Sequence, residues 1–434
     1  MKLKLPVLFY AIFLIPTFLL SQAPKTGLQP ATPETVGMSS ERLEMLDDLI
    51  QQYIDQNWFP GGEFLIARQG KIVYHKCFGH RTPAKIKTYQ TSDIYRLASM
   101  TKAITTVSIM QLYEQGKLGL DDPIHLYIPA FKDAAVLELD SYNKADTSYT
   151  TVPAKQPVSI RHLLTHTSGI TYGDFHQDPI RAVYHKLGMR AVGLSHAEWT
   201  TEEFINKLAE VPLTFQPGEQ YSYGLNMDVL GRIVEVVSNM SLSDYFKKNI
   251  FEPLGMEDTG FYLPENKHDR LVPVYTQNQE KGIHISEDNT AEYPKMKDNN
   301  HYAGGGGLSG TARDYAKFIQ ALVNGGTYNG KRILGRKTIE VMTSDQLMMQ
   351  NKEGKGFSQR PGLTYGLGFA LVTEEGNGWT PKSPGTYDWG GYFNTKFFID
   401  PTEDLIFVGM SQIVPFYHQE FWDRIYALIY SAVE

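Results

Sequence analysis

Strand-like segments lie near both ends of the sequence, and helical patterns fill the part between them. Residues 63–81 read as a β-hairpin, because two apolar, β-rich runs flank a turn at Gln69-Gly70. Further strand-like runs follow near the C-terminus, at 365–372, 394–400 and 404–411. One sheet is therefore expected to combine strands from both ends of the chain.

This order of elements predicts an α+β fold with an antiparallel sheet flanked by helices. Residues 24–119 and 301–434 would form a discontinuous sheet domain, and residues 120–300 an inserted, mainly helical domain. The long polar stretches 140–157 and 280–300 are expected to be surface loops or lids of that insertion.

Composition and charge exclude several classes of function. The 434 residues are 42% hydrophobic and 21% charged, which is the balance of a globular protein. The net charge is −7 and no lysine or arginine cluster stands out, which argues against a nucleic-acid partner. Cys77 is the single cysteine, so the chain has no internal disulfide, and this residue fits a small core position better than a nucleophile.

The N-terminus has the pattern of a secretory signal. Lys2 and Lys4 precede an uncharged apolar run from Leu5 to Leu20. Cleavage after Ser21 or Ala23 would remove a signal peptide of residues 1–23 and leave a periplasmic or secreted chain with no stable membrane insertion. An uncleaved membrane anchor is the alternative, because the run is long for a signal core and short for a membrane span.

Several other motifs predict no chemistry. The sequence GGGLSG at 305–310 has the glycine pattern of a dinucleotide-binding turn, but no strand precedes it, so a flexible loop next to a helix is expected. His162 and His166 are four residues apart without a third ligand, so packing and capping are favoured over zinc. No G-x-S-x-G elbow is present, which disfavours an α/β-hydrolase. No metal or organic cofactor is expected.

The pair Ser99 and Lys102 is the strongest chemical signal. Apolar residues at spacings of three and four predict an amphipathic helix that starts here, which places the two side chains one turn apart. A lysine in a partly buried position can accept a proton, and a serine is a weak nucleophile until a base takes its proton. Ser141 and Lys144 have the same spacing, but they lie in a polar loop, and we interpret that match as chance.

With these residues in place, the chain resembles the serine β-lactamase-like superfamily, on the branch of class C β-lactamases, D-aminopeptidases and family VIII carboxylesterases. The resemblance covers Pro33 to the C-terminus and rests on five stretches in a characteristic order. They are RLASMTKAIT, IRHLLTHTSGI, FQPGEQYSYGLNMDVLG, AGGGGLSGTARDYAKF and TYDWGGYFNTKFFIDP. A β-lactamase/transpeptidase-like fold is what this resemblance implies.

The resemblance assigns roles residue by residue. Ser99 matches the acylated nucleophile, and Lys102 matches the lysine that activates it. Tyr223 matches the tyrosine of the family's Tyr-x-Asn motif, with Tyr221 as the alternative. Leu225 stands at the asparagine position, and Asn226 is one residue away.

The third motif of the family matches Trp389, Gly390 and Gly391, which we expect at the start of a strand. Tyr392 would supply the second oxyanion N–H, with Ser99 supplying the first. Relatives that bind a free carboxylate have a lysine or histidine where this chain has Trp389. A tryptophan offers apolar surface instead, which favours an uncharged acyl or alcohol group.

The sequence therefore predicts an exported serine hydrolase that cleaves a small carboxylic ester, as the carboxylesterase members do. Three alternatives remain open: a β-lactamase or D-amino-acid peptidase that uses the same serine on an amide, a penicillin-binding or sensor protein that acylates without turnover, and an acyltransferase. A small-molecule ester or amide is the expected partner, and the oligomeric state is left open.

Overall fold

A central sheet of eight strands organises the molecule. The computed structural model describes residues 27–82, 84, 86–189, 194, 198–278, 282–347, 357 and 362–434. The strand order is β1-β3-β2-β16-β15-β14-β13-β12. The strands are β1 (Gln29–Pro30), β2 (Gly61–Arg68), β3 (Lys71–Gly79), β12 (Leu363–Tyr365), β13 (Ala370–Val372), β14 (Tyr387–Gly391), β15 (Thr395–Asp400) and β16 (Leu405–Met410).

The sheet joins the two ends of the chain, as the sequence predicts. β2 pairs with β16, so that Phe64 faces Gly409 across the two strands. The predicted hairpin is β2–β3, and its turn residues Gln69 and Gly70 both have positive φ values, of 52° and 74°. This is the backbone geometry of a tight hairpin turn that matches the twist of its strands.

One edge of the sheet differs from the expected antiparallel pattern. β1 pairs with β3 in parallel, whereas all other neighbouring strands of this sheet are antiparallel. β1 has only two residues, and one of them is Pro30. Such a short segment has no alternation of apolar and polar residues, so its sequence gave no strand signal.

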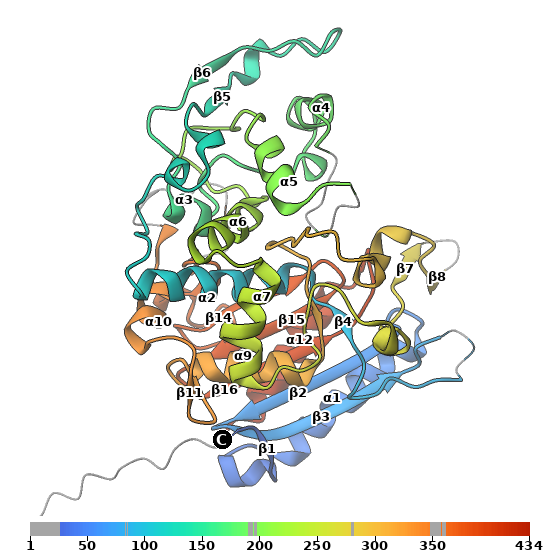
Figure 1. Cartoon of the computed structure of the whole chain (residues 1–434). Helices are drawn as coiled ribbons and strands as arrows, with labels where there is room; N and C mark the ends of the chain where they lie inside the picture. The colour runs from blue at the N-terminus through green and yellow to red at the C-terminus, as the bar shows by residue number, and fades with distance from the viewer. Residues whose placement is uncertain are drawn as a thin grey trace, which may run out of the picture.

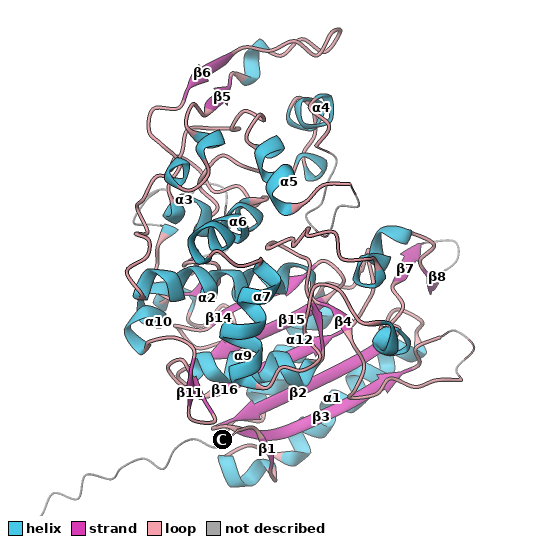
Figure 2. Ribbon diagram, viewed as in Figure 1, coloured by secondary structure: helices cyan, strands magenta, loops and turns pink. Residues whose placement is uncertain are grey.

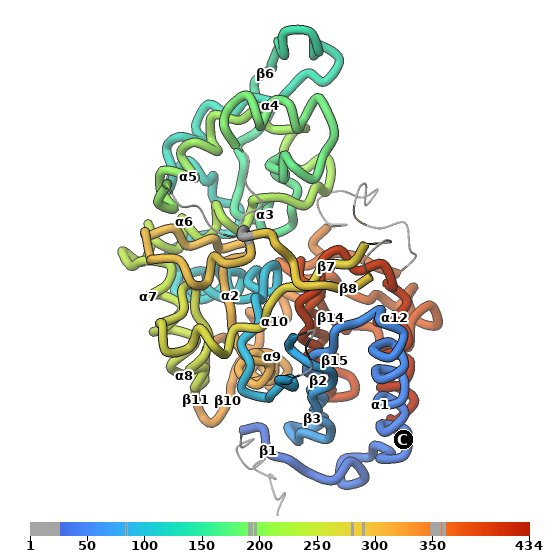
Figure 3. Tube along the Cα trace, turned by 90° about the vertical axis from the view of Figure 1, so that its right-hand side faces the viewer, coloured from blue at the N-terminus to red at the C-terminus, as the bar shows by residue number. Residues whose placement is uncertain are grey.

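Helices cover both faces of the sheet. α1 (Ser40–Asp55) and α12 (Glu420–Ser431) lie on one face, and α9 (Ala312–Val323) lies on the other (Figures 1 and 3). Successive residues of β15 alternate between these layers: Phe397 packs in the core shared with α9, and Phe398 packs in the core shared with α1 and α12. The helix expected next to the stretch 305–310 is thereby confirmed as α9.

A mainly helical part stands above the sheet (Figure 2). Its helices are α3 (Ile160–Leu164), α4 (Ile180–Lys186), α5 (Thr201–Leu208) and α6 (Asn226–Ser238). The chain then descends through α7 (Leu242–Phe246) to α8 (Glu252–Leu254), which lies beside α9 and β11 (Lys331–Arg332) (Figure 3). Short strand pairs complete the chain: β4 (Tyr95–Arg96) with β9 (Ser309–Gly310), β5 (Ala135–Leu137) with β6 (Thr151–Pro153), β7 (Tyr275–Asn278) with β8 (Gly282–Ile285), and β10 (Thr327–Tyr328) with β11. A further helix, α10 (Arg336–Met342), lies beside α2.

The long polar stretches contain regular structure. Residues 140–157 include strand β6, which is exposed at the tip of the helical part. Residues 280–300 include β8 and the 3-10 segment Asn289–Lys295, in which Tyr293 is buried. The second stretch is therefore anchored by its aromatic residue and is not a purely solvated loop.

Helix α2 (Thr101–Glu114) runs between the helical part and the sheet. All of its residues from Thr101 to Leu112 are buried. The sequence predicted a helix with one apolar face, but α6 and α7 cover the side that an isolated amphipathic helix would expose to water. The polar residues on α2 therefore need partners inside the protein.

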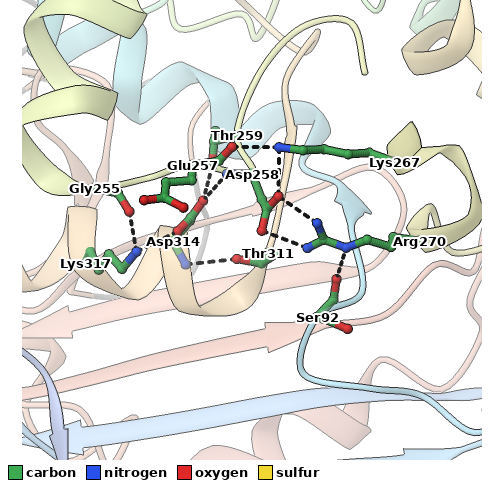
Figure 4. A network of polar contacts seen from close by, with 10 residues as sticks. All are labelled: Ser92, Gly255, Glu257, Asp258, Thr259, Lys267, Arg270, Thr311, Asp314 and Lys317. Carbon is green, nitrogen blue, oxygen red and sulfur yellow. Dashed lines mark hydrogen bonds and ion pairs between the residues drawn. The ribbon is translucent and has the colours of Figure 1, made fainter. Parts of the chain in front are cut away.

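Charged side chains tie the segment after α8 to the sheet layer (Figure 4). Asp258 accepts two hydrogen bonds from the guanidinium of Arg270, both of 2.7 Å, and forms an ion pair of 2.9 Å with Lys267. Asp314, in the first turn of α9, accepts from the backbone N–H of residue 258. Arg270 also donates to the carbonyl of Ser92, which leads into β4. This network holds the segment that leads through β4 to Ser99.

No helix within residues 27–434, as far as they are described, is long and apolar enough to cross a membrane. The predicted signal peptide, residues 1–23, lies outside the described residues.

Candidate active site

Ser99 lies in a single 3-10 turn, Ala98–Met100, that leads directly into α2. The residue before it, Ala98, has a φ of 45°, which is an uncommon backbone conformation for a residue with a side chain. Neighbouring contacts hold the turn: Leu97 N–H donates to the carbonyl of Leu308, and the hydroxyl of Tyr315 donates to the carbonyl of Met100. The strained backbone next to Ser99 is typical of a functional position.

Lys102 is fully buried, and its ammonium nitrogen is surrounded by oxygen atoms. Nζ lies 3.2 Å from Ser99 Oγ, 3.1 Å from Tyr172 Oη and 2.5 Å from the carbonyl oxygen of Gly305. It also lies 4.7 Å from the centre of the Tyr223 ring. The contact between Ser99 and Lys102 is the one that the S-x-x-K spacing predicts, and its length suits the transfer of a proton.

The glycine-rich segment is part of this site. Residues 303–310 are all buried. The prediction that this segment is a flexible loop is therefore wrong. The Gly305 carbonyl accepts from Lys102, and the Gly305 N–H donates to Asp228 Oδ1 at 3.2 Å. A Cβ atom on residue 305 would lie 2.5 Å from Asp228 Oδ2, so only glycine fits between the two groups.

Asp228, on α6, is buried next to this segment. Its second oxygen, Oδ2, has no hydrogen-bond partner among the described residues. Burial raises the pKa of this carboxyl to about 6, although the charge of Lys102 and the Gly305 N–H both act to lower it. Gly305 thus connects a buried carboxyl, through its N–H, to the lysine that contacts Ser99, through its carbonyl oxygen.

Tyr172 was not identified from the sequence. It follows the THTSG stretch in an irregular segment, and its hydroxyl accepts from Lys102 inside the protein. Burial, and then the nearby Tyr223 and Asp228, raise the pKa of Tyr172, which keeps its hydroxyl protonated at neutral pH. The only sequence signal was its place two residues after the stretch that carries the resemblance.

Tyr223 lies where the resemblance predicts, beside Lys102. Its hydroxyl accepts from the indole nitrogen of Trp389 at 3.3 Å. Tyr221, the alternative, is buried and packs against His166 and Tyr365. The geometry therefore joins Tyr223, and not Tyr221, to Lys102 and Trp389.

The positions after Tyr223 have structural partners. Leu225 is buried at the start of α6. Asn226 is also buried: its amide donates to His166 Nδ1 and to the carbonyl of Ile170, and its oxygen accepts from Ser168. Asn226 thereby holds the segment that leads to Tyr172.

Trp389, Gly390 and Gly391 form the end of β14, so their predicted place at the start of a strand is wrong. The strand begins two residues earlier because Tyr387 and Asp388 already pair with β15 and β13. A Cβ atom on residue 391 would lie 2.4 Å from the carbonyl oxygen of Leu97. Glycine at this position lets β14 approach the segment just before Ser99.

A cavity of about 830 Å³ opens over these groups. Its lining includes Ser99, Tyr172, Tyr223, Trp389 and the two glycines after it, together with Tyr392 and Lys396. The side chain of Tyr392 is 49% exposed and packs near Phe175, so it borders the opening. Ser99 can therefore be reached by a small molecule.

The remaining sequence candidates have structural contacts of their own. His162 is the third residue of α3, where its ring accepts from the N–H of Ser159 in a capping box. His166 is buried among aromatic rings, and burial lowers its pKa well below the usual value. Ser141 donates to the carbonyl of Glu138 in the exposed loop between β5 and β6.

A serine in contact with a buried lysine, on a sheet built from both ends of the chain, is the arrangement expected of a serine hydrolase. The sequence profile of the Beta-lactamase family matches residues 46–428, and the chain belongs to that family. Esterase EstB of Burkholderia gladioli is 27% identical over 370 residues, which are 82% of this chain and 86% of that protein. Lovastatin esterase of Penicillium rubens is 29% identical over 387 residues, 85% of this chain and 92% of that one.

The fold agrees with that of a solved relative. EstCE1, described as a hydrolase with promiscuous acyltransferase activity, superimposes with a TM-score of 0.73 and 26% sequence identity. The match covers 90% of this chain and 98% of EstCE1. The β-lactamase/transpeptidase-like fold expected from the sequence is confirmed.

Proposed function

We propose that the protein hydrolyses small carboxylic esters through an acyl-enzyme on Ser99. The observation that carries this proposal is the contact of 3.2 Å between Ser99 Oγ and Lys102 Nζ beside an open cavity. The similarity to two esterases and to the hydrolase EstCE1 supports an ester as the substrate.

Lys102 acts as the base in its unprotonated form. A neutral amine has two N–H donors and one lone pair. Gly305 O and Tyr172 Oη occupy the donors, and the lone pair then points to the hydroxyl of Ser99. As Ser99 Oγ attacks the carbonyl carbon, its proton moves to Lys102 Nζ.

The developing oxyanion is stabilised by the backbone N–H groups of Ser99 and Tyr392. Tyr223, assisted by the indole of Trp389, relays the proton from Lys102 to the leaving alcohol, and the C–O bond of the ester breaks. Water then attacks the acyl group with the same residues as base, which returns a proton to Ser99 and releases the acid.

Export is part of the proposal. Lys2, Lys4 and the apolar run after them are the support for a cleaved signal peptide and a periplasmic or secreted enzyme. A helical insertion over residues 120–300 would then cover the site from one side.

A substrate panel on purified protein tests the proposal. Short-chain nitrophenyl esters should turn over continuously, and a chromogenic cephalosporin and D-amino-acid peptides should react more slowly. If the protein prefers the cephalosporin or the peptides, it is a β-lactamase or a peptidase and the esterase proposal is wrong. A burst without steady turnover would indicate a penicillin-binding or sensor protein. An alcohol acceptor that outcompetes water would indicate an acyltransferase. We include this test because EstCE1 is described as having promiscuous acyltransferase activity.

A further inference from the structure

The cavity continues from Ser99 around an open edge of the sheet. β13 pairs with β14 only at Tyr387 and Asp388, so the last three residues of β14 have no neighbouring strand on that side among the described residues. The lining reaches Trp422 and Tyr426 of α12 as well as Ser99, which lies on the opposite side of the sheet. A substrate bound at Ser99 can extend around the edge of β14 toward α12.

Lys396 lies in the part of the cavity that faces α12. It is the direct partner of Gly390 in the β14–β15 pair, and it points to the same face as Phe398, which packs under α12. A Cβ atom on residue 390 would lie 2.8 Å from Lys396 Cδ and 3.0 Å from Nζ. The missing side chain of Gly390 therefore makes room for this lysine beside the third motif.

The ammonium of Lys396 makes no hydrogen bond or ion pair with the residues that the structure describes. Burial, more than any neighbouring charge, lowers its pKa from the usual value. A partly buried cation without a partner is costly for a protein to maintain. Such a group is expected to have a ligand as its partner.

The other charged groups in this part of the cavity are already paired or face solvent. Lys382 forms an ion pair with Asp388 of 2.5 Å, and its ammonium lies 4.3 Å from the centre of the Tyr426 ring. Asp423 is exposed at the border of α12. Lys382 opposes the positive charge on Lys396, and Asp388 and Asp423 favour it. Because Lys382 neutralises Asp388, a negative ligand near Lys396 faces only the solvated Asp423.

We propose that Lys396 binds a carboxylate carried by the substrate, so that the preferred ester has an anionic group at the end remote from its reacting carbonyl. This inference rests on the proposed function, because it names the substrate class of the Ser99 site. It changes one expectation from the sequence, which found no cation near the third motif and favoured an uncharged substrate. The cation comes from the next strand, across from Gly390.

Two pairs of esters test the inference, each with one member charged and the other neutral. In the acyl pair, the para-nitrophenyl monoester of adipic acid is compared with its methyl ester. In the alcohol pair, meta-acetoxybenzoate is compared with methyl meta-acetoxybenzoate. The ratio of kcat/KM for the charged member to kcat/KM for the neutral member is measured in the wild type, Lys396→Met and Lys396→Gln. Lys337→Met, which removes an exposed lysine of α10, is the matched control.

Both Lys396 variants should lower this ratio about tenfold or more in one pair, which also identifies whether the charge belongs to the acid or the alcohol. The loss on the charged member should exceed any change on its neutral counterpart, and Lys337→Met should leave the ratio unchanged. An unchanged ratio in both pairs, or an equal loss on charged and neutral esters, overturns the inference.

A failure of the proposed function gives a different result. If the wild type hydrolyses none of the four esters, the esterase proposal fails, and binding alone then tests the inference. Titration calorimetry on Ser99→Ala should show that meta-acetoxybenzoate binds about tenfold more weakly after Lys396→Met is added, whereas its methyl ester does not. Equal affinities with and without Lys396 would reject the carboxylate site.

Discussion

At the scale of single residues, the site depends on what surrounds one nitrogen atom. Lys102 Nζ contacts Ser99, Tyr172 and Gly305, and these partners are 3, 70 and 203 residues away in the chain. Only the first spacing is short enough for a helix to impose it. The S-x-x-K pair was therefore predictable from the sequence, whereas the other two contacts depend on the tertiary fold.

The two tyrosines next to Lys102 should differ in their effect on catalysis. Tyr223→Phe should reduce kcat/KM for a nitrophenyl ester by several orders of magnitude, about as much as Lys102→Met, because the two groups act on one proton. The double variant should be little worse than the worse single variant. Tyr172→Phe removes one partner of Lys102 and should cost about tenfold to a hundredfold.

Tyr221→Phe is the control for these variants, because Tyr221 is a buried tyrosine of the same segment whose ring packs against His166 and Tyr365. Its kcat/KM should stay within about a factor of three of the wild type. If Tyr221→Phe is inactive while Tyr223→Phe remains active, the register of the Tyr-x-Asn motif is wrong by two residues.

At the scale of elements, α6 positions Lys102 through the glycine-rich segment. Asp228 accepts from the N–H of Gly305, and the carbonyl of the same residue accepts from Lys102. The sequence could not reveal this arrangement, because the glycine pattern resembled a dinucleotide-binding turn and Asp228 is one of many acidic residues. Glycines before a helix indicate only that the backbone passes close to another group. They do not identify that group.

Replacing this buried carboxyl should change the pH dependence of the reaction. With a pKa of about 6, Asp228 is mostly neutral below that pH and charged above it. Its charge favours the protonated form of Lys102, so the acidic limb of kcat/KM should lie at lower pH in Asp228→Asn. The two profiles should converge below pH 6, and the exposed-site variant Asp140→Asn should match the wild type. Superimposable profiles would show that Asp228 does not act on the base.

The charge network after α8 should contribute to stability in a pH-dependent way. Hydrogen bonds from Arg270, and then the contacts with Lys267, lower the pKa of Asp258 to about 2 from its model-compound value of 3.8. A depressed carboxyl pKa stabilises the fold above the unfolded pKa, and that contribution is lost as the pH falls through the folded value.

Asp258→Asn should therefore lower the free energy of unfolding by about 1–2 kcal/mol at pH 7, after allowance for its partial exposure. Urea unfolding from pH 7 to pH 3 should show the difference between variant and wild type shrinking below about pH 4. A difference that does not change with pH would mean that the carboxylate charge is not what matters.

At the scale of the whole molecule, the sequence predicted the architecture better than its details. The β2–β3 hairpin and α9 follow from local patterns, and the order of strands and helices along the chain predicted the pairing of the two chain ends. Strand β1 and the complete burial of α2 were missed, because both are decided by what packs against them. Lys396 was missed for the same reason, since only the pairing of β14 with β15 brings it beside Gly390.

The whole chain should also be processed at its N-terminus. Expression in a bacterial host with its export system should give a mature protein whose first residue lies between about 22 and 25, because the apolar run then ends at a cleavage site. N-terminal sequencing of the extracellular or periplasmic fraction measures this directly. A membrane-bound protein that still begins at Met1 would support the anchor instead.

The central claim, that Ser99 forms the acyl-enzyme, is tested most directly by covalent labelling. A serine-directed fluorophosphonate should add one mass increment to the wild type, and peptide mapping should locate it on Ser99. Ser99→Ala should take up no label and lose ester turnover, while Ser141→Ala should behave as the wild type in both respects. A label on Ser141, or wild-type turnover by Ser99→Ala, would contradict the mechanism.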